Sequence, residues 1–489
     1  MNARVRVVKK SRGAKRGSGA QGGQGGGGGR SVGDERRAAR PDARRASAAR
    51  RAAFEVLRRV EEEGAFAAPL LASVAEELRA DDRALCYELV LGCLRRQLWL
   101  DRLMQLYAGR EASSVDAPVR RALRLGLYQL RFLSRVPASA AVNESVNLMH
   151  EAGLRSATKF VNAVLRRATR EPERDPAEGI EDWTERVSVE TSHPAWLVAR
   201  WAASFGAEEA EAFARANNRT PPTAFRVNPL RAESAEVLER LREAGAEPVE
   251  SSVAPGAFRL EGGGGGVALL RELAERGFVY MQDEASQLVA HVLGARRSER
   301  VLDACAAPGS KTTQLAALAG DAAFIVAGDL YGHRLRLVEE AAARQNLKSI
   351  RCVVYDAEQG LPFADASFER VLVDAPCTGT GTLRHNPEIR WRIRASDIAE
   401  LAARQQRILE AASRAVRPGG RLVYSTCSVE PEENESVVSA FLADRSDDFR
   451  QLPASPASTD FLTPSGAARI WPHRDDTDGF FVAAFERRS

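Results

Sequence analysis

Apolar residues recur at helical spacing through the first large segment of the chain, residues 48–170. Val56 and Val60 stand one helical turn apart, and similar spacing continues through 119–132 and 142–151 with almost no Gly or Pro inside the segments. An apolar position every three or four residues marks one face of an amphipathic helix. The pattern therefore predicts a compact all-helical domain over residues 48–170.

In residues 278–489 the pattern changes to short apolar runs that alternate with helical segments. The expected strands lie at 301–302, 324–327, 350–354, 371–373 and 421–424. Alternating strands and helices predict an α/β fold, in which helices cover both faces of a parallel sheet. A last apolar run, 479–486, predicts a final antiparallel strand at the edge of that sheet.

Residues 171–277 connect these two parts. The stretch 171–183 is acidic, contains two prolines and is typical of a linker. Apolar runs at 223–227 and 257–260 flank a helical segment at 234–244. We therefore expect a linker followed by a small α+β module.

The chain begins with a basic tail. Residues 1–50 contain 14 Lys or Arg and three Asp or Glu, a charge of +11, so the rest of a chain of net charge +4 sums to −7. We expect residues 1–47 to be disordered, because they contain too little apolar surface to fold. Attraction to phosphates and a purely solubilising role are both open for this tail. Its glycine run, 22–29, disfavours an organellar transit peptide.

The composition excludes several classes of protein. No run approaches the roughly 18 apolar residues of a membrane span, and no apolar segment near the start indicates secretion. The six cysteines are dispersed, without a C-x-x-C pair, which argues against a disulfide scaffold or a bound metal. Cys86 and Cys93, seven positions apart, are expected in the helical core. We expect a cytoplasmic protein and, without a further association segment, a monomer.

Polar residues follow the first expected strand, at the end where open α/β sheets bind ligands. Asp303 precedes a tight turn that opens a helix, and the free N–H groups of a helix start favour a carboxylate or phosphate. The turn is neither G-x-G-x-x-G nor a phosphate-binding loop. This absence argues against a nicotinamide or a nucleoside triphosphate.

Two more aspartates follow the next strands. Asp329 comes after the second strand, in a position that suits the hydroxyls of a ribose, and Asp356 comes after the third, where an adenine would lie. Each aspartate alone could simply cap a helix or lie in a loop. Their succession at strand ends indicates an adenosine-bearing cofactor with a charged amino-acid end.

The fourth and fifth strands end near cysteines. Asp374 and Cys377 follow the fourth strand, and Cys427 follows the fifth. A single cysteine is more often an inert core residue, but two at adjacent strand ends indicate chemistry. A thiolate that adds to C6 of a cytosine makes C5 nucleophilic enough to accept a methyl group; a base then removes the C5 proton and the thiol is eliminated. The target base has to leave any stack to reach such a site.

Five motifs resemble those of the bacterial Sun-type RNA cytosine-C5 methyltransferases: QDEAS from Gln282, DACAAPGSKTTQL from Asp303, DAPCTGTGTLRHNPEIRW from Asp374, STCSVEPEENE from Ser425 and DGFFVAAFERR from Asp478. The helical region resembles the NusB-like RNA-binding domain of this subfamily, and RVNP at 226–229 resembles the module before its catalytic domain. The resemblance covers about residue 48 to the end. It implies an all-α NusB-like domain, a small α+β module and a Rossmann-like class I methyltransferase domain.

The resemblance also implies the cofactor and the residues that bind it. The loop that would hold the methionine part of S-adenosyl-L-methionine consists of Cys305, Ala306, Ala307, Pro308, Gly309, Ser310 and Lys311. Asp329 would bind the ribose, Asp356 would border the adenine, and Asp374 would lie between the cofactor and the target base. Ser310, Thr378 and Asn386 stand where the family commonly has glycine, serine and histidine, and these changes leave the cofactor assignment standing.

The catalytic roles come from the resemblance alone, because the chemistry does not rank the two cysteines. Cys427 would be the nucleophile, Cys377 would assist release of the product, and Lys311 would hydrogen-bond around the reacting base. The implied partner is RNA, and the NusB-like domain favours small-subunit (16S) ribosomal RNA. Two alternatives stay open: a transfer RNA substrate, and a non-catalytic RNA-binding factor of ribosome assembly.

Four arginines follow the Pro-Cys loop: Arg384, Arg390, Arg392 and Arg394. Basic side chains close to a catalytic loop predict contacts with RNA phosphates. Ordinary solvated surface charge is the other interpretation.

Overall fold

The computed structural model describes residues 45–261, 264–454 and 460–489. Residues Arg44 to Ser489 form one compact unit. Residues 1–44 of the expected basic tail lie outside the described residues. Ser47 directly precedes the first helix and its backbone N–H donates to Glu144, so the folded part begins close to the expected residue 48.

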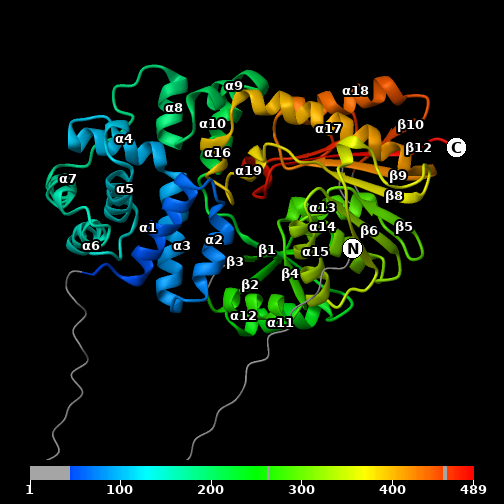
Figure 1. Cartoon of the computed structure of the whole chain (residues 1–489), viewed down its shortest axis with the longest axis horizontal. Helices are drawn as coiled ribbons and strands as arrows, with labels where there is room; N and C mark the ends of the chain where they lie inside the picture. Colours follow the sequence, from blue (N-terminus) through cyan, green and yellow to red (C-terminus); the bar gives the residue numbers. More distant parts are fainter. Residues whose placement is uncertain (1–44, 262–263, 455–459) are drawn as a thin grey trace, which may run out of the picture. The chain divides into compact units, whose positions relative to one another are not determined.

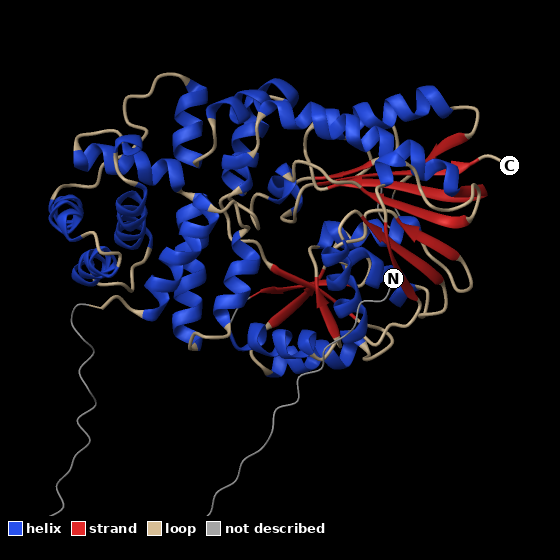
Figure 2. Cartoon of the chain, viewed as in Figure 1, coloured by secondary structure: helices blue, strands red, loops and turns tan. Residues whose placement is uncertain are grey.

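The part that precedes residue 171 is helical throughout its described length (Figure 2). Its helices are α1 (Ala48–Glu62), α2 (Ala67–Ala75), α3 (Ala80–Arg95), α4 (Gln97–Ala108), α5 (Ala117–Phe132), α6 (Ala138–Glu151) and α7 (Thr158–Arg170). Their apolar faces enclose one core, which contains Cys86 and Cys93 as expected. Burial raises the pKa of the Cys86 thiol to about 11, so this thiol is a core residue rather than a reactive group.

Three further helices follow the linker: α8 (Trp183–Thr191), α9 (Ala195–Phe205) and α10 (Ala207–Ala216). They share a hydrophobic core with Leu383, Val429 and Trp471, which belong to loops of the C-terminal domain. The indole N–H of Trp201 also donates to Glu430 at 3.1 Å. These helices are therefore packed against the C-terminal domain.

A small antiparallel sheet comes next, with strand order β2-β3-β1-β4. Its strands are β1 (Thr223–Val227), β2 (Glu247–Glu250), β3 (Ala257–Glu261) and β4 (Val279–Met281), and its helices are α11 (Ser234–Glu243) and α12 (Gly264–Glu275). Both helices lie on one face of the sheet (Figure 1). Strand β4 lies just beyond residue 277, so the sheet extends the small module slightly past its expected end.

The C-terminal domain is built on an eight-stranded sheet of order β10-β12-β9-β8-β5-β6-β7, with β11 also paired to β12. Its strands are β5 (Arg300–Asp303), β6 (Phe324–Asp329), β7 (Ile350–Val354), β8 (Phe368–Asp374), β9 (Val416–Thr426), β10 (Phe449–Leu452), β11 (Ala468–Ile470) and β12 (Phe480–Arg487). Strands β5 to β9 are parallel to one another, as the alternating pattern predicts.

Helices cover both faces of this sheet (Figure 1). One face carries α13 (Glu284–Leu293), α14 (Ser310–Leu318) and α15 (Gly332–Arg344), and the other carries α17 (Ala395–Ala415) and α18 (Glu435–Arg445). Two short helices, α16 (Ile389–Arg392) and α19 (Pro472–Asp475), lie in the connecting loops. Among the described residues, no helix combines the length and the apolar character needed to cross a bilayer.

The last strand is antiparallel, as expected, but its expected position at the sheet edge is wrong. Strand β12 pairs with β9 on one side and with β10 and β11 on the other. Six consecutive residues of this strand, 480–485, are buried. A strand that is covered on both faces has an unbroken apolar run, whereas a half-exposed edge strand alternates. The run FFVAAF therefore belongs in the interior of the sheet.

The expected RNA contact of the arginine segment, residues 384–394, is wrong for two of its four arginines, because their side chains are buried. Arg384 and Arg390 are 1% and 0% exposed. Arg392 donates to the carbonyls of Val60 and Ala65. Only Arg394 is well exposed, and it pairs with Asp397 at 3.3 Å.

The arginine segment instead binds helix ends of the helical domain. Arg390 donates to the carbonyl of Arg95 at 3.4 Å and the indole of Trp391 donates to the carbonyl of Leu94 at 3.4 Å, both in the last turn of α3. The final carbonyls of a helix lack partners within the helix and carry partial negative charge. The guanidinium group of Arg390 supplies a cationic donor there, which accounts for its burial. Arg384 is instead buried against Thr477 and Asp476.

Candidate functional site

The strand order reverses between β5 and β8, because β6 and β7 lie on one side of β5 whereas β8 and β9 lie on the other. Loops after two adjacent strands then diverge and leave a crevice, where open α/β sheets bind ligands. A cavity of about 250 Å³, here called the inner cavity, lies at this point. The predicted residues that line it are Cys305, Ala307, Asp329, Asp356, Asp374, Cys377 and Cys427.

The loop after β5 forms one wall of the inner cavity. The backbone N–H of Ala306 donates to the carbonyl of Gly328 at 2.7 Å, which holds the loop against β6. Gly309 has a φ of +104°, and a side chain there would meet the backbone of Val338 at 3.0 Å. Glycine is therefore required at this turn, which leads directly into α14.

The seven residues expected to hold the methionine part of the cofactor do not all face the same space. Cys305 and Ala307 line the inner cavity, whereas Ala306 is buried behind it at 5% exposure. Pro308 and Ser310 face a second depression, described below. Burial, reinforced by the nearby carboxylate of Asp303, raises the pKa of the Cys305 thiol, which keeps it neutral.

Asp329 ends β6, and its carboxylate accepts the backbone N–H of Tyr331 at 3.1 Å and pairs with Arg334 at 3.2 Å. Asp356 follows β7, and one of its oxygens caps a short turn by accepting the N–H of Glu358 at 3.0 Å. Asp356 is thus a capping residue, as an aspartate at this position could simply be. It is also part of the cavity wall. Asp329 is 5% exposed, and it faces the cavity.

Asp374 and Lys311 form an ion pair at the base of the site. The ammonium group of Lys311 lies 2.7 Å from one carboxylate oxygen of Asp374, and the hydroxyl of Ser425 donates to the other at 2.8 Å. Burial alone would lower the pKa of Lys311, but Asp374 raises it above its usual value. Lys311 is therefore a fixed cation between the ends of β8 and β9.

The two cysteines lie side by side. The sulfur atoms of Cys377 and Cys427 are 3.4 Å apart, and both residues line the inner cavity. The hydrogen bond with Cys427 and burial together raise the pKa of Cys377 well above that of a free thiol. Cys377 is therefore the protonated partner of the pair.

A buried carboxylate that sequence reasoning missed ties the two cysteine loops together. Glu433 is 0% exposed and accepts the backbone N–H of Thr378 at 2.9 Å, the hydroxyl of Thr378 at 2.5 Å and the hydroxyl of Ser428. Burial raises its pKa. In the sequence Glu433 is one of four acids in the motif VEPEENE. Glu430 and Glu433 are buried, and nothing in the motif separates these two from the others.

A second depression, here called the outer groove, meets the inner cavity at Cys427. It has a volume of about 650 Å³ and is lined by residues of the small sheet, the loop after β5, the segment before α16 and the loop before β12. Cys427 lines both spaces. The cysteine sulfur therefore stands between a chamber of cofactor size and a larger opening to the surface.

Three side chains in the outer groove satisfy the distance requirement for a metal site. Ligand atoms of Asp283, His385 and Asp478 lie within 4.8 Å of one another. These atoms already bond to their neighbours: Nδ1 of His385 lies 2.9 Å from Asp478, and Asp283 accepts the hydroxyl of Thr477 at 2.8 Å. The group is a closed hydrogen-bonded cluster, and we assign no metal to it.

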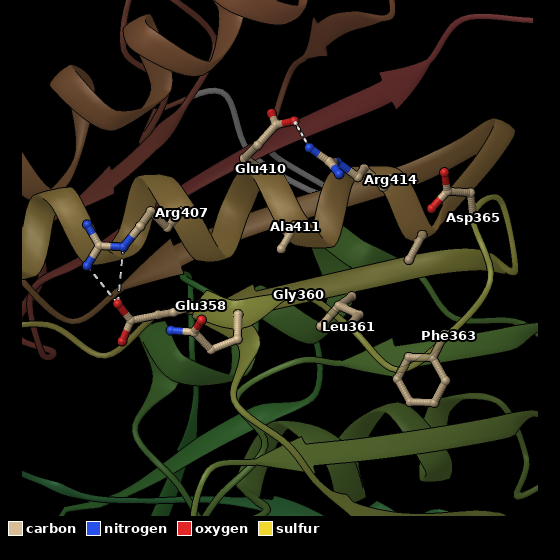
Figure 3. A pocket seen from close by; sticks show the side chains of 11 residues that line it. Glu358, Gly360, Leu361, Phe363, Asp365, Arg407, Glu410, Ala411 and Arg414 are labelled. Atoms are coloured by element: carbon tan, nitrogen blue, oxygen red, sulfur yellow. Dashed lines mark hydrogen bonds and ion pairs between the residues drawn. The ribbon is translucent and has the colours of Figure 1, made fainter.

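Another cavity, of about 380 Å³, lies between α17 and the loop after β7 (Figure 3). Both arginines of its lining are in ion pairs, Arg407 with Glu358 at 2.7 Å and Arg414 with Glu410 at 3.6 Å. None of the predicted site residues lines it. The chemistry therefore belongs to the inner cavity and the outer groove.

A doubly wound sheet with an antiparallel strand between β9 and β10, and with aspartates at the switch point, defines the class of α/β methyltransferases that use S-adenosylmethionine. Sequence comparison gives the family. The profile described as 16S rRNA methyltransferase RsmB/F matches residues 290–486. The NusB family matches residues 47–170, and the ferredoxin-like domain of RsmF/B-like methyltransferases matches residues 193–265.

Similar proteins extend along most of the chain. The probable ribosomal RNA small subunit methyltransferase B of Synechocystis sp. is 37% identical over 90% of this chain and 99% of its own. Its namesake in Bacillus subtilis is 36% identical over 89% of this chain and 98% of its own. The crystal structure of PH0851 has a TM-score of 0.77 and 29% identity, and covers 90% of this chain and 98% of its own. The chain belongs to the RsmB/F methyltransferase family, and its methyl donor is S-adenosylmethionine.

Proposed function

We propose that this enzyme methylates C5 of a cytosine in 16S ribosomal RNA, with Cys427 as the covalent nucleophile. The proposal is based on the cysteine pair. The sulfur atoms of Cys377 and Cys427 lie 3.4 Å apart, where the inner cavity meets the outer groove and close to the Lys311–Asp374 ion pair. The family supports the reaction type. The names of the relatives from Synechocystis and Bacillus support a small-subunit ribosomal RNA substrate.

The residues of the inner cavity fit S-adenosylmethionine, which supplies a methyl group activated by a positively charged sulfur. Asp329 offers a carboxylate for ribose hydroxyls, and the free oxygen of Asp356 borders the adenine end. Tyr355 lines the same cavity, but its hydroxyl is buried against Gly328 of β6 and we assign it no contact with the bound molecule. We assign the loop 305–311 to the methionine end, with Cys305 and Ala307 in contact with it.

In the proposed mechanism the target cytosine turns out of its stack into the outer groove. The thiolate of Cys427 adds to C6 of the base, and the electron pair of the C5–C6 double bond becomes available at C5. C5 then takes the methyl group. A base from the solvent in the outer groove takes the C5 proton, the double bond re-forms and the Cys427 thiolate is expelled, so the sulfur returns to its starting state.

The neighbouring residues prepare these steps. Asp374 lies between the inner cavity and Cys427, where its carboxylate can accept a hydrogen bond from the amino group of cytosine. Lys311 holds Asp374 in place through the 2.7 Å ion pair. Cys377, which stays protonated, lies close enough to the sulfur of Cys427 for its S–H to hydrogen-bond to the departing thiolate as the adduct breaks. We therefore assign product release to Cys377.

The proposed division of labour follows the fold. Residues 48–170 form an NusB-like domain that binds RNA, residues 171–277 with β4 form the linking region and small module, and the remaining residues carry the chemistry. We propose that the enzyme works as a monomer in the cytoplasm, where ribosomal RNA is assembled.

Bisulfite sequencing of total RNA tests the substrate. In a strain that lacks the gene, we expect one cytosine of 16S ribosomal RNA to lose its resistance to bisulfite conversion. A gene copy that encodes Cys427→Ala should not restore this resistance, whereas a wild-type copy should. Loss of the mark from a transfer RNA instead would assign the substrate to that class, and an unchanged pattern would favour a non-catalytic role.

A further inference from the structure

The outer groove has an unusual charge for a surface that receives RNA. Its lining includes two carboxylates, Asp283 and Asp478, but no lysine or arginine. Among these lining residues His385 is the one side chain that can carry a positive charge. Phosphodiesters are repelled by carboxylates unless a cation lies between them. The charge on His385 therefore decides whether the groove attracts or repels the phosphates of the RNA backbone.

The fold fixes the orientation of His385. Nδ1 of the imidazole lies 2.9 Å and 3.0 Å from the two oxygens of Asp478, so this nitrogen donates to the carboxylate. Asp478 is only 5% exposed, and its backbone N–H donates to Asp283 at 3.1 Å. Asp283 in turn accepts the hydroxyl of Thr477. A histidine whose Nδ1 is held this way presents Nε2 in a fixed direction.

The other face of His385 is open. Its side chain is 40% exposed, and the residue shares the outer groove with Cys427. Nε2 is thus available to a ligand in the groove. An imidazolium N–H is a strong donor to a phosphate oxygen.

We propose that His385 is the RNA-contact residue of the outer groove, where its Nε2–H binds a phosphate next to the target cytosine. This inference rests on the proposed function, in which the target RNA enters this groove. His385 is a binding residue in this account and takes no part in proton transfer at the base.

The contact is expected to depend on pH. The charged groups that face His385 are Asp478 and Asp283, which favour the imidazolium, and Arg384, which opposes it; Tyr280 and Cys427 are the other titratable residues of the groove. Burial alone would lower the pKa of His385, but Asp478 raises it above its usual value. The phosphate contact is therefore present at low pH and lost as the pH rises through this raised pKa.

Steady-state kinetics with full-length enzyme and unmodified 16S ribosomal RNA test the proposal. We expect His385→Gln to raise KM for RNA about 10-fold near neutral pH with little change in kcat. His385→Arg, which keeps a cation at every pH, should restore KM and make it independent of pH. His333→Gln is the control and should leave KM unchanged, because it removes an exposed histidine on α15 that lines neither the inner cavity nor the outer groove.

Salt dependence gives a second measurement that does not require turnover. RNA binding to the His385→Gln variant should lose about 0.7 from the slope of log K against log salt at pH ~6, and nothing at pH ~9. A loss of kcat with KM unchanged would make His385 an acid–base group and overturn the proposal, as would a wild-type salt slope in His385→Gln. If the wild-type enzyme methylated no ribosomal RNA, the proposed function itself would fail.

Discussion

Two polar stretches follow the same strand, β8, and lie in opposite environments. The first, with Asp374 and Cys377, faces the inner cavity and stays accessible to ligands. The second, the arginine segment 384–394, turns away, and Arg390 and Arg392 bind backbone carbonyls of the helical domain. Both stretches carry polar side chains and follow the carboxyl end of a strand. The first is placed by its own sheet, whereas the second is placed by helices some 290 residues earlier in the chain.

The difference shows which kind of inference a sequence supports. Parallel strands bring their carboxyl ends to one edge, so residues there come together whatever the rest of the chain does. A charged side chain in a long connection has no such constraint, and its partner can belong to another domain. The same argument separates residues that serve the reaction from residues that hold the domains together.

The largest structural effect should come from the arginine segment. Arg390→Met removes the donor for five acceptors, including the carbonyls of Ser192, Asn217 and Leu383. Buried acceptors without a donor are costly, so we expect the free energy of unfolding to fall by about 3 kcal/mol. Urea denaturation measures this change.

Arg394→Met is the matched control for this prediction, because the Arg394 side chain is 80% exposed. It should change the free energy of unfolding by less than ~0.5 kcal/mol. If instead both variants kept wild-type stability and bound RNA with a shallower salt dependence, the segment would be a phosphate contact after all and the comparison would collapse.

The next effect sharpens the account of the catalytic loops. Glu433→Gln turns one acceptor oxygen into a donor beneath Thr378 and Ser428, so the loops of Cys377 and Cys427 lose their common support. We expect kcat to fall about 10²-fold, since small shifts of reacting groups cost that much. Methyl transfer to RNA measures the loss, and calorimetry should show unchanged S-adenosylmethionine binding.

Glu432→Gln provides the control for the loop support. Glu432 precedes Glu433 but is 45% exposed and pairs with Arg200 at the surface. Its kcat should remain within about twofold of the wild-type value. Equal losses in both variants would show that the acidic stretch acts through its charge and not through the buried hydrogen bonds.

The smallest effect concerns the cofactor. Asp329→Asn should raise Kd for S-adenosylmethionine about 10-fold, because a charge-assisted hydrogen bond to the ribose becomes a neutral one. Isothermal titration calorimetry measures this. Asp365→Asn, which alters the lining of the cavity beneath α17 (Figure 3), should leave Kd unchanged. A raised Kd in Asp365→Asn together with an unchanged Kd in Asp329→Asn would indicate that the cofactor binds in that cavity instead.

Much of the catalytic domain can be predicted from the sequence, because parallel strands bring their carboxyl ends to one edge of the sheet. Strands β5 to β9 are revealed by their short apolar runs, and the ends of these strands carry Asp329, Asp374 and both cysteines. The interior position of β12 could have been inferred from its unbroken apolar run, since an edge strand would alternate.

Other features depend on partners that are distant in the sequence. The burial of Arg390 depends on the end of α3 and the loop after α8, so local pattern cannot reveal it. Glu433 looks like any surface acid, because its role comes from the loop of Cys377 that folds over it. Pro308 and Ser310 belong to the predicted cofactor loop but face the outer groove, because the loop turns between two spaces.

The most direct test of the account is covalent trapping. When Cys377→Ala is incubated with S-adenosylmethionine and unmodified 16S ribosomal RNA, the Cys427 adduct should form but fail to break down, and a protein–RNA band should survive a denaturing gel. The variant that carries both Cys377→Ala and Cys427→Ala should give no such band. A stable adduct in that double variant, or full methyl transfer by Cys427→Ala alone, would contradict the assignment of Cys427 as the nucleophile.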